Sequence, residues 1–352
     1  MILITKPRVT SGGVYTFVEN ITPFLGADTV VFLRGNKVGN ANKLLRLFYS
    51  IVNPFVFIKT LILRNPDEVI INTSLSFSCL LRDGVLVFIS KLFQKKVLLI
   101  IHGFQEAALG HWALLKAGYF RADAITVLAN EFKEKLRSTG YGKPVSILYN
   151  PVDKELLDQG SVTISNRIVN VLFMARIEKN KGVDIAIEAF ISAAKKFPHL
   201  KLHIAGTGTE YNALLSRYSS NKSIHFYGFV TGAQKKELLL SSDLFLFPTY
   251  YEGLPISILE AMSAGHYIIT RPVGGLKDLF LKHNFGYCVD SLEVKEFAKA
   301  LCDAIDHEAD CLTLRRANRK FAQEHFNPAR VANAIKEILN KINDEGRNSD
   351  HR

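Results

Sequence analysis

The chain has 352 residues, 48% of them hydrophobic and 22% charged. This length suggests about two domains, and the composition is typical of a soluble globular protein, which excludes a disordered or fibrous chain. The net charge of +11 indicates an anionic partner, which could be a phosphate ligand, a nucleic acid or a lipid surface. No C-x-x-C pair occurs, so a disulfide scaffold or zinc site is not expected.

The first half of the chain alternates short apolar runs with segments of helical period. Such alternation is typical of parallel strands joined by right-handed helical crossovers. The chain begins with M-I-L-I-T-K-P, which lacks the features of a signal peptide, so we expect a cytoplasmic protein. Strands are predicted near residues 1–6, 29–33, 68–72, 97–101, 124–128 and 145–148.

One apolar segment of this half, residues 44–63, resembles a membrane span but is interrupted by Arg46, Asn53, Pro54 and Lys59. Charges and a broken helix would be costly in lipid, so a transmembrane helix is excluded. Two interpretations remain open. The segment is either a buried helix pair or an amphipathic surface that rests on an anionic membrane through the basic residues Lys43, Arg46, Lys59 and Arg64.

The polar stretch 153–167 predicts a linker, after which the alternating pattern begins again. Helices are predicted near 181–196 and 255–264, and an amphipathic helix over 329–342 precedes a tail, 343–352, that we expect to be disordered. Domains are expected at 1–155 and 165–328. Strands are predicted near residues 168–174, 200–205, 224–227, 244–247, 267–270 and 286–289.

The strongest chemical signal is P-T-Y-Y-E-G-L-P-I-S-I-L-E-A-M-S-A-G at 248–265. Pro255 and Gly265 suit the start and end of a short helix, which places Glu252 in the preceding loop and Glu260 within the helix. The apolar neighbours predict burial, where a carboxylate without a partner is costly. These two carboxylates could therefore hold two polyols, such as a ribose and a hexose.

Two further loops follow predicted strands of the second half. Arg176 and Lys181 come after the strand near 168–174, and the carboxyl ends of parallel strands are where open sheets bind ligands, so both could hold a phosphate. A solvated basic loop is the alternative interpretation. Gly206 and Gly208 follow the next strand as a bare G-x-G, which is a weak dinucleotide fingerprint.

In the first half, Gly12 and Gly13 lie between a strand and a helix, where backbone N–H groups could approach a phosphate or a sugar. His102 ends a strand that is predicted to be buried. A histidine at that end of a parallel strand faces the ligand crevice, although a lone histidine is more often structural.

Taken together, these residues resemble family 4 of the retaining glycosyltransferases, which have the GT-B fold of two Rossmann-like, doubly wound parallel-sheet domains facing a cleft. The resemblance implies an N-terminal acceptor-binding domain and a C-terminal domain that binds a nucleotide sugar. It implies that Arg176 and Lys181 bind the diphosphate, that Glu260 binds the ribose and that His102 lies beside the anomeric carbon. The other implied donor-binding residues are Gly12, Gly13, Gly206, Val230, Glu252, Gly253 and Leu254.

The resemblance further implies transfer of a hexose, with retention, from a UDP or GDP sugar to a glycan or lipid-linked acceptor in the synthesis of a surface polysaccharide. No D-x-D motif occurs, so neither a metal nor another cofactor is expected. The fold leaves two alternatives, a nucleotide-sugar epimerase and a non-catalytic nucleotide-binding protein. A nucleic-acid partner is not expected, because the sequence lacks a clustered basic and aromatic stripe.

Overall fold

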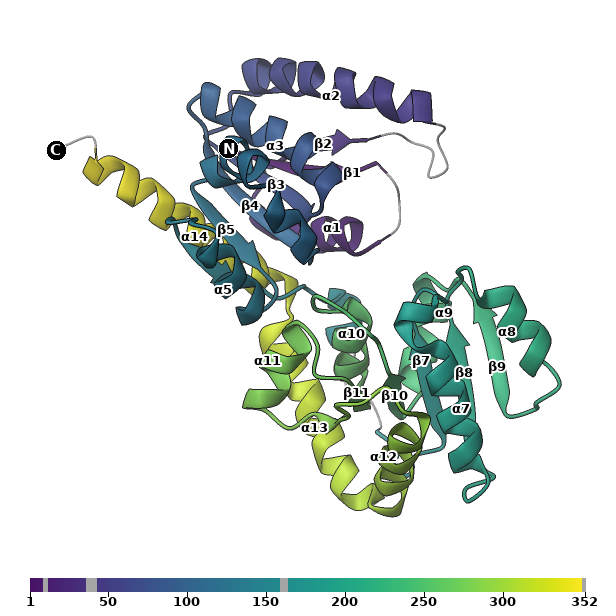
Figure 1. Cartoon of the computed structure of the whole chain (residues 1–352). Coiled ribbons are helices and arrows are strands. Elements are labelled where there is room, and N and C mark those ends of the chain that lie inside the picture. The colour runs from purple at the N-terminus through teal and green to yellow at the C-terminus, as the bar shows by residue number, and fades with distance from the viewer. Residues whose placement is uncertain (9–11, 36–42, 159–163, 350–352) are drawn as a thin grey trace. The chain divides into compact units, whose positions relative to one another are not determined.

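The computed structural model describes residues 1–8, 12–35, 43–158 and 164–349, with the backbone alone at 43–47, 50 and 345–349. The chain divides into two compact units (Figure 1). The first contains Met1–Pro151 together with Pro328–Arg352, and the second contains Val152–Asn327.

The first unit is built on a parallel sheet of order β2-β1-β3-β4-β5-β6. Each strand was predicted from its apolar run, because strands covered on both faces are almost continuously hydrophobic. The strands are β1 Ile2–Pro7, β2 Val30–Arg34, β3 Glu68–Leu75, β4 Lys96–Phe104, β5 Ala124–Val127 and β6 Val145–Ile147.

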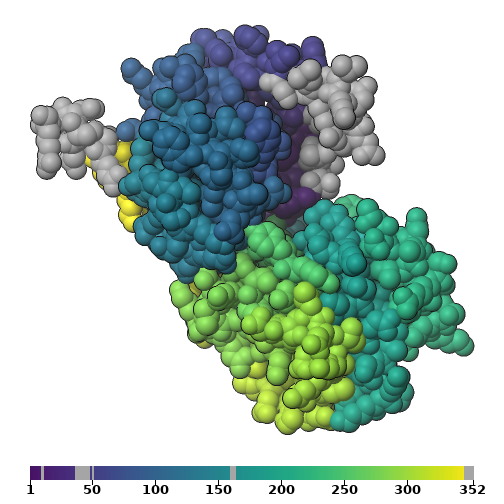
Figure 2. Space-filling view, in the orientation of Figure 1, coloured from purple at the N-terminus to yellow at the C-terminus, as the bar shows by residue number. Residues whose placement is uncertain are grey.

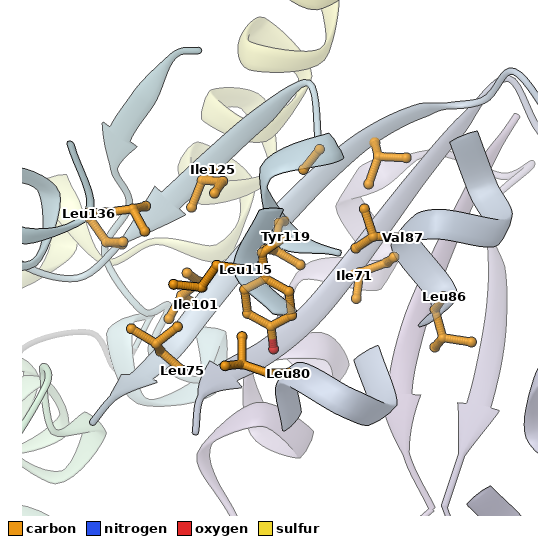
Figure 3. Packing of buried hydrophobic residues seen from close by; sticks show 14 of the residues in the cluster. Ile71, Leu75, Leu80, Leu86, Val87, Ile101, Leu115, Tyr119, Ile125 and Leu136 are labelled. Atoms are coloured by element: carbon orange, nitrogen blue, oxygen red, sulfur yellow. The ribbon is translucent and has the colours of Figure 1, made fainter. Parts of the chain in front are cut away.

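Helices cover both faces of this sheet. Alternate residues of β4 point to opposite sides, so Leu98 and Ile100 pack with α1 (Gly13–Leu25) and α14 (Pro328–Ser349). On the other side, Leu99 and Ile101 pack with the remaining helices around Tyr119 (Figure 3). Those helices are α2 Lys43–Arg64, α3 Phe77–Leu92, α4 Trp112–Ala117 and α5 Asn130–Ser138, with the short 3-10 helices η1 Glu106–Gly110 and η2 Tyr119–Arg121.

The segment 44–63 is neither a transmembrane helix nor a buried helix pair. It forms the single helix α2, which continues through Pro54. Phe57 and Leu61 fix one side of this helix in the core. No helix in the described part of the chain is long and apolar enough to cross a membrane.

The second unit repeats the architecture with the sheet order β12-β11-β10-β7-β8-β9, again parallel throughout. Its strands are β7 Asn170–Met174, β8 Lys201–Ala205, β9 Ile224–Gly228, β10 Leu244–Phe247, β11 Tyr267–Thr270 and β12 Gly286–Cys288. Its helices are α6 Lys154–Leu157, α7 Val183–Ala194, α8 Tyr211–Tyr218, α9 Gly232–Ser241, α10 Ile256–Ala264, α11 Gly275–Lys282, α12 Val294–Asp306 and α13 Glu308–His325, with the 3-10 turn η3 Lys179–Lys181.

The unit boundaries differ from the expected 155 and 165. Residues 152–155 belong to the second unit, where the Val152 amide donates to the Phe326 carbonyl at 2.9 Å. The final helix belongs to the first unit, because Ala332, Ile335 and Leu339 pack against α1 and the sheet.

Disorder was expected from residue 343, but α14 continues to Ser349 rather than ending at 342. Ile342 is still buried in the core of the first unit. At the next position, the Asn343 side chain donates a 2.8 Å hydrogen bond to Glu68. These contacts carry the helix past the apolar pattern, and residues 350–352 lie outside the described chain.

Candidate donor site

The loops after β7, β8, β10 and β11 all leave the carboxyl edge of the second sheet, and glycines allow them to touch. A Cβ on Gly206 would lie 1.8 Å from the Ala175 carbonyl oxygen, and one on Gly274 would lie 2.0 Å from that of Glu252. Both glycines also have positive φ, at 135° and 50°, which side chains disfavour. The four loops therefore form one packed edge, where open parallel sheets bind their ligands.

Lys181 and Glu252 meet at this edge. Lys181 ends η3, just before α7, and Glu252 lies in the loop between β10 and α10. The lysine Nζ donates to the carboxylate Oε1 at 2.5 Å, and the two side chains are only 11% and 17% exposed. Burial raises the pKa of Glu252 above its usual 4.5, and the positive charge of Lys181 opposes that rise. The sequence placed both residues in the donor site without predicting that they pair.

Glu260 forms a second ion pair, in which the carboxylate is more deeply buried than that of Glu252. It lies on α10, is 3% exposed, and accepts a 2.5 Å hydrogen bond from Nζ of Lys235 on α9. Burial raises the pKa of the carboxyl group against the attraction of the lysine. Lys235 was not predicted as a site residue. Its spacing of three and four residues from the buried Leu238 and Leu239 was the available signal, because that spacing puts all three on one side of a helix.

Arg176, which was expected to bind the same phosphate as Lys181, lies at the surface. Its side chain is 67% exposed and its guanidinium pairs with Glu178 at 2.6 Å. The sequence analysis did not consider Glu178 as a partner. Arg176 still lowers the pKa of Glu252 through its charge, so it contributes positive potential at the same edge.

The remaining predicted donor residues of this unit lie in these loops or in the loop after β9. The Gly206 amide donates to the carbonyl of Gly228, which ends β9, and Val230 follows two residues later. Gly253 accepts a hydrogen bond from the amide of Gly275, and Leu254 is buried beneath.

In the first unit, the structure brings His102 beside α1, the helix that starts at Gly13. The His102 ring contacts Phe17 of that helix edge-on, with centroids 4.5 Å apart. Gly12 caps α1 with a φ of 102° and is exposed, like Gly13. Thr10 and Ser11, which precede Gly12 in the chain, lie outside the described residues.

Asn72 fixes which nitrogen of His102 carries the proton. The Asn72 Nδ2 donates to the Thr5 carbonyl at 2.8 Å, so its Oδ1 must be the atom 2.9 Å from His102 Nε2. An amide oxygen only accepts, so Nε2 donates and Nδ1 keeps its lone pair. Burial holds the pKa of His102 well below its usual 6.5, and the ring is neutral at neutral pH. The sequence analysis missed Asn72, which is separated from His102 along the chain and meets it only because β3 and β4 are neighbours.

Residues 161–341 match the family model described as Glycosyl transferases group 1, which is just over half of the chain. The chain belongs to the group 1 glycosyl transferases. It is similar to a protein of Salmonella typhimurium named as a colanic acid biosynthesis glycosyltransferase, WcaL, with 24% identity over 263 residues. That alignment covers 70% of this chain and 64% of WcaL, so this chain spans less than two thirds of the length of that relative.

Solved structures show the fold of this group 1 glycosyl transferase. Sucrose-phosphate synthase from Thermosynechococcus elongatus superposes with a TM-score of 0.77 and 17% identity, covering 98% of this chain and 99% of that one. Anabaena Alr3699/HepE in complex with UDP-glucose gives 0.74 and 16%, covering 97% and 99%. Two six-stranded parallel sheets with flanking helices, shared with these proteins, make the fold GT-B.

We expect Glu260→Gln to weaken donor binding by about 10- to 100-fold, the range for losing a hydrogen bond to a charged group. Glutamine keeps the volume of the side chain but removes the charge that would accept ribose hydroxyls. Calorimetric titration with nucleotide and with nucleotide sugar gives the affinity. The control is Glu324→Gln on the exposed side of α13, which should bind like the wild type. Unchanged affinity in a folded Glu260→Gln variant would show that Glu260 does not bind the donor.

Proposed function

We propose that this group 1 glycosyl transferase moves a hexose, with retention of configuration, from a UDP or GDP sugar to a glycan or lipid-linked acceptor. The observation that carries the proposal is the pair of buried carboxylates, each held by a lysine, at the carboxyl edge of the second sheet. UDP is favoured over GDP because a protein of the same fold was solved with UDP-glucose. The similarity to WcaL supports a role in surface-polysaccharide synthesis, such as O-antigen or capsule.

In this proposal the carboxylates of the two ion pairs bind different parts of the donor. Glu260 accepts hydrogen bonds from the ribose hydroxyls, and Glu252 accepts them from the transferred sugar, together with the backbone at Gly253 and Leu254. Lys181 then turns from Glu252 toward the diphosphate, where Arg176 adds its charge. The ligand-free pairing keeps both carboxylates compensated until hydroxyl groups take the place of the lysines.

The proposed chemistry is attack from the face that the leaving group occupies. The bond from the anomeric carbon to the phosphate oxygen breaks as the acceptor oxygen forms its bond to the same carbon. The acceptor proton passes to the departing phosphate oxygen, so configuration is retained without a carboxylate nucleophile. Negative charge grows on the diphosphate during this step, and the positive charges of Lys181 and Arg176 oppose it. His102 is proposed to contact the transferred sugar.

Donor binding tests the proposal first. A nucleotide sugar that binds only the folded protein at 100 times its dissociation constant adds about 2.7 kcal/mol to the free energy of unfolding. We expect this stabilisation, measured as a rise in melting temperature, with one or more UDP or GDP sugars. The Glu260→Gln variant should lose most of the rise. A panel of nucleotide sugars that leaves the wild type unchanged would contradict the proposal.

Transfer is expected to survive removal of divalent ions. Arg176 and Lys181 supply the charge that a metal would otherwise supply, so EDTA should leave the rate within about twofold of the untreated enzyme, a difference below 0.5 kcal/mol in the barrier. Initial rates with EDTA, and with EDTA followed by excess magnesium or manganese, give the comparison. Loss of activity that either metal restores would show that a metal takes part.

A further inference from the structure

The first unit exposes two rows of large apolar side chains, on neighbouring helices α2 and α3. On α2 the side chains are exposed by 57% to 69% at four positions spaced as one helical stripe, Phe48, Ile51, Phe55 and Ile62. On α3 a second stripe recurs every three or four residues. We call these rows, together with two further residues of α2, the α2–α3 face: Phe48, Ile51, Phe55, Val56, Ile62 and Leu63 of α2, and Phe77, Leu81, Val85, Phe88 and Leu92 of α3.

The core does not need this face. Phe57 and Leu61 of α2 already fill the inner side of that helix. Leu86 and Val87 do the same for α3 (Figure 3). Each helix is therefore apolar on two opposite sides, a pattern usual for helices covered on both. In the space-filling view the indigo atoms of α2 lie at the surface of the first unit (Figure 2). Contiguous exposed apolar rows of this kind mark interaction sites on soluble domains.

The charged residues of the two helices are basic with one exception. The α2 segment contains Lys43, Arg46, Lys59 and Arg64 and no acidic residue, although the side chains of Lys43 and Arg46 lie outside the described part. The only acidic residue of α3 is Asp83, which is buried and paired.

Aromatic and basic groups also meet beside α3. The Arg121 guanidinium stacks over the Phe88 ring at 5.1 Å, and Lys116 lies 4.7 Å from the ring of the exposed Trp112. Tryptophan and basic residues flanking an apolar surface are typical of proteins that rest at the boundary between water and lipid.

We infer that the α2–α3 face docks onto the surface of an anionic lipid bilayer. Two copies of this chain joined face to face would bring Lys59, Arg64 and Arg121 of each copy together and would repel, whereas phosphate headgroups compensate these charges. The apolar rows then enter the headgroup region. The inference rests on the proposed function only for the purpose of the docking. A first unit docked on the bilayer lies in the same plane as a lipid-linked acceptor.

The test is flotation of the full chain with vesicles of phosphatidylglycerol and phosphatidylcholine, and with vesicles of phosphatidylcholine alone. One variant, Phe55→Gln with Ile62→Gln and Leu63→Gln, removes the apolar row of α2. A second, Lys59→Gln with Arg64→Gln, removes charge. The matched controls are Leu281→Gln, an exposed leucine of the second unit, and Lys222→Gln with Lys320→Gln, two exposed lysines of that unit.

We expect the wild type to bind the anionic vesicles at about 0.01 M salt and to lose most of this binding near 1 M, where the Debye length falls from about 30 Å to about 3 Å. The apolar variant should have at least about a tenfold lower affinity for the vesicles, because each replaced side chain would otherwise bury several carbons away from water. The charge variant should lose its preference for anionic lipid, and both controls should bind like the wild type.

Two results would overturn the inference. One is a wild type that ignores anionic vesicles at low salt, and the other is a folded apolar variant that binds as well as the wild type. A wild-type dimer that becomes a monomer in the apolar variant, with no vesicle binding, would assign the face to a second copy instead. Thermal shift with UDP is read in parallel, because failure of nucleotide binding would count against the proposed function while leaving vesicle binding as it is.

Discussion

Replacing Lys181 with methionine is expected to lower the turnover number by about 100- to 1000-fold, the range found when one preorganised group that stabilises developing charge is removed. Methionine keeps most of the volume of the 11%-exposed lysine side chain and removes only the charge. The donor diphosphate gains negative charge as it leaves, so the loss should fall mainly on kcat rather than on KM. Arg176→Ala should act in the same direction. Its effect is expected to be smaller, because its side chain is largely exposed and screened.

The control for this experiment lies two residues away. Lys179 belongs to the same 3-10 turn but is exposed, so Lys179→Met should leave turnover near the wild-type value. Lys181→Met also leaves Glu252 without its partner, and the double variant with Glu252→Gln separates lost stability from lost catalysis through its melting temperature. Normal turnover in both Lys181→Met and Arg176→Ala would contradict the proposed mechanism.

The second large effect is expected for His102→Ala, which should reduce kcat by about 100-fold, the lower end of what a positioned polar group contributes. Donor affinity should change much less. His203 is the matched control, since it is also a half-buried histidine on a sheet strand, and burial lowers its pKa to about 4. His203→Ala should leave kcat close to wild type. A wild-type rate for His102→Ala would make His102 a structural residue.

Asn72 provides a further check on His102, because its proposed part in the reaction is only to orient the ring. Asn72→Leu should lower kcat when His102 is present and should have little additional effect in the His102→Ala background, which a double-mutant cycle measures. The pH profile adds an independent reading. With the pKa of His102 well below 6.5, the wild type should show no loss of kcat from this group as the pH falls from 8 through about 6. Additive effects of the two substitutions would separate Asn72 from the role of His102.

Much of the fold was predictable, because parallel strands buried on both faces leave continuous apolar runs, and every predicted strand of both sheets appears in the structure. The end of α14 was not. The tail after Ile342 is polar, and only contacts such as that from Asn343 to Glu68 carry the helix further. Glu252, Glu260 and Lys181 could be chosen from local sequence, because loops at strand ends and caps of a short helix are local signals.

The partners of these residues could not be chosen in the same way. Lys235 reaches Glu260, and Asn72 reaches His102, through neighbouring elements of the fold rather than along the sequence. Glu178 is close enough to Arg176 along the chain to be considered as its partner. The sequence does not decide whether an exposed arginine pairs with a neighbouring carboxylate or binds a ligand. The exposure of the α2–α3 face could not be predicted either, because the sequence does not distinguish an apolar residue that faces solvent from one in the core.

Whether this protein transfers a sugar is decided by analysis of the reaction products. Purified protein is incubated in EDTA with each of a set of labelled UDP and GDP hexoses, together with a mixture of lipid-linked and free glycan acceptors. We expect release of the nucleoside diphosphate and a labelled glycoside whose anomeric configuration, read by NMR, is that of the donor. The same labelled nucleotide sugar recovered as an epimer, binding without any product, or a product of inverted configuration would contradict this expectation.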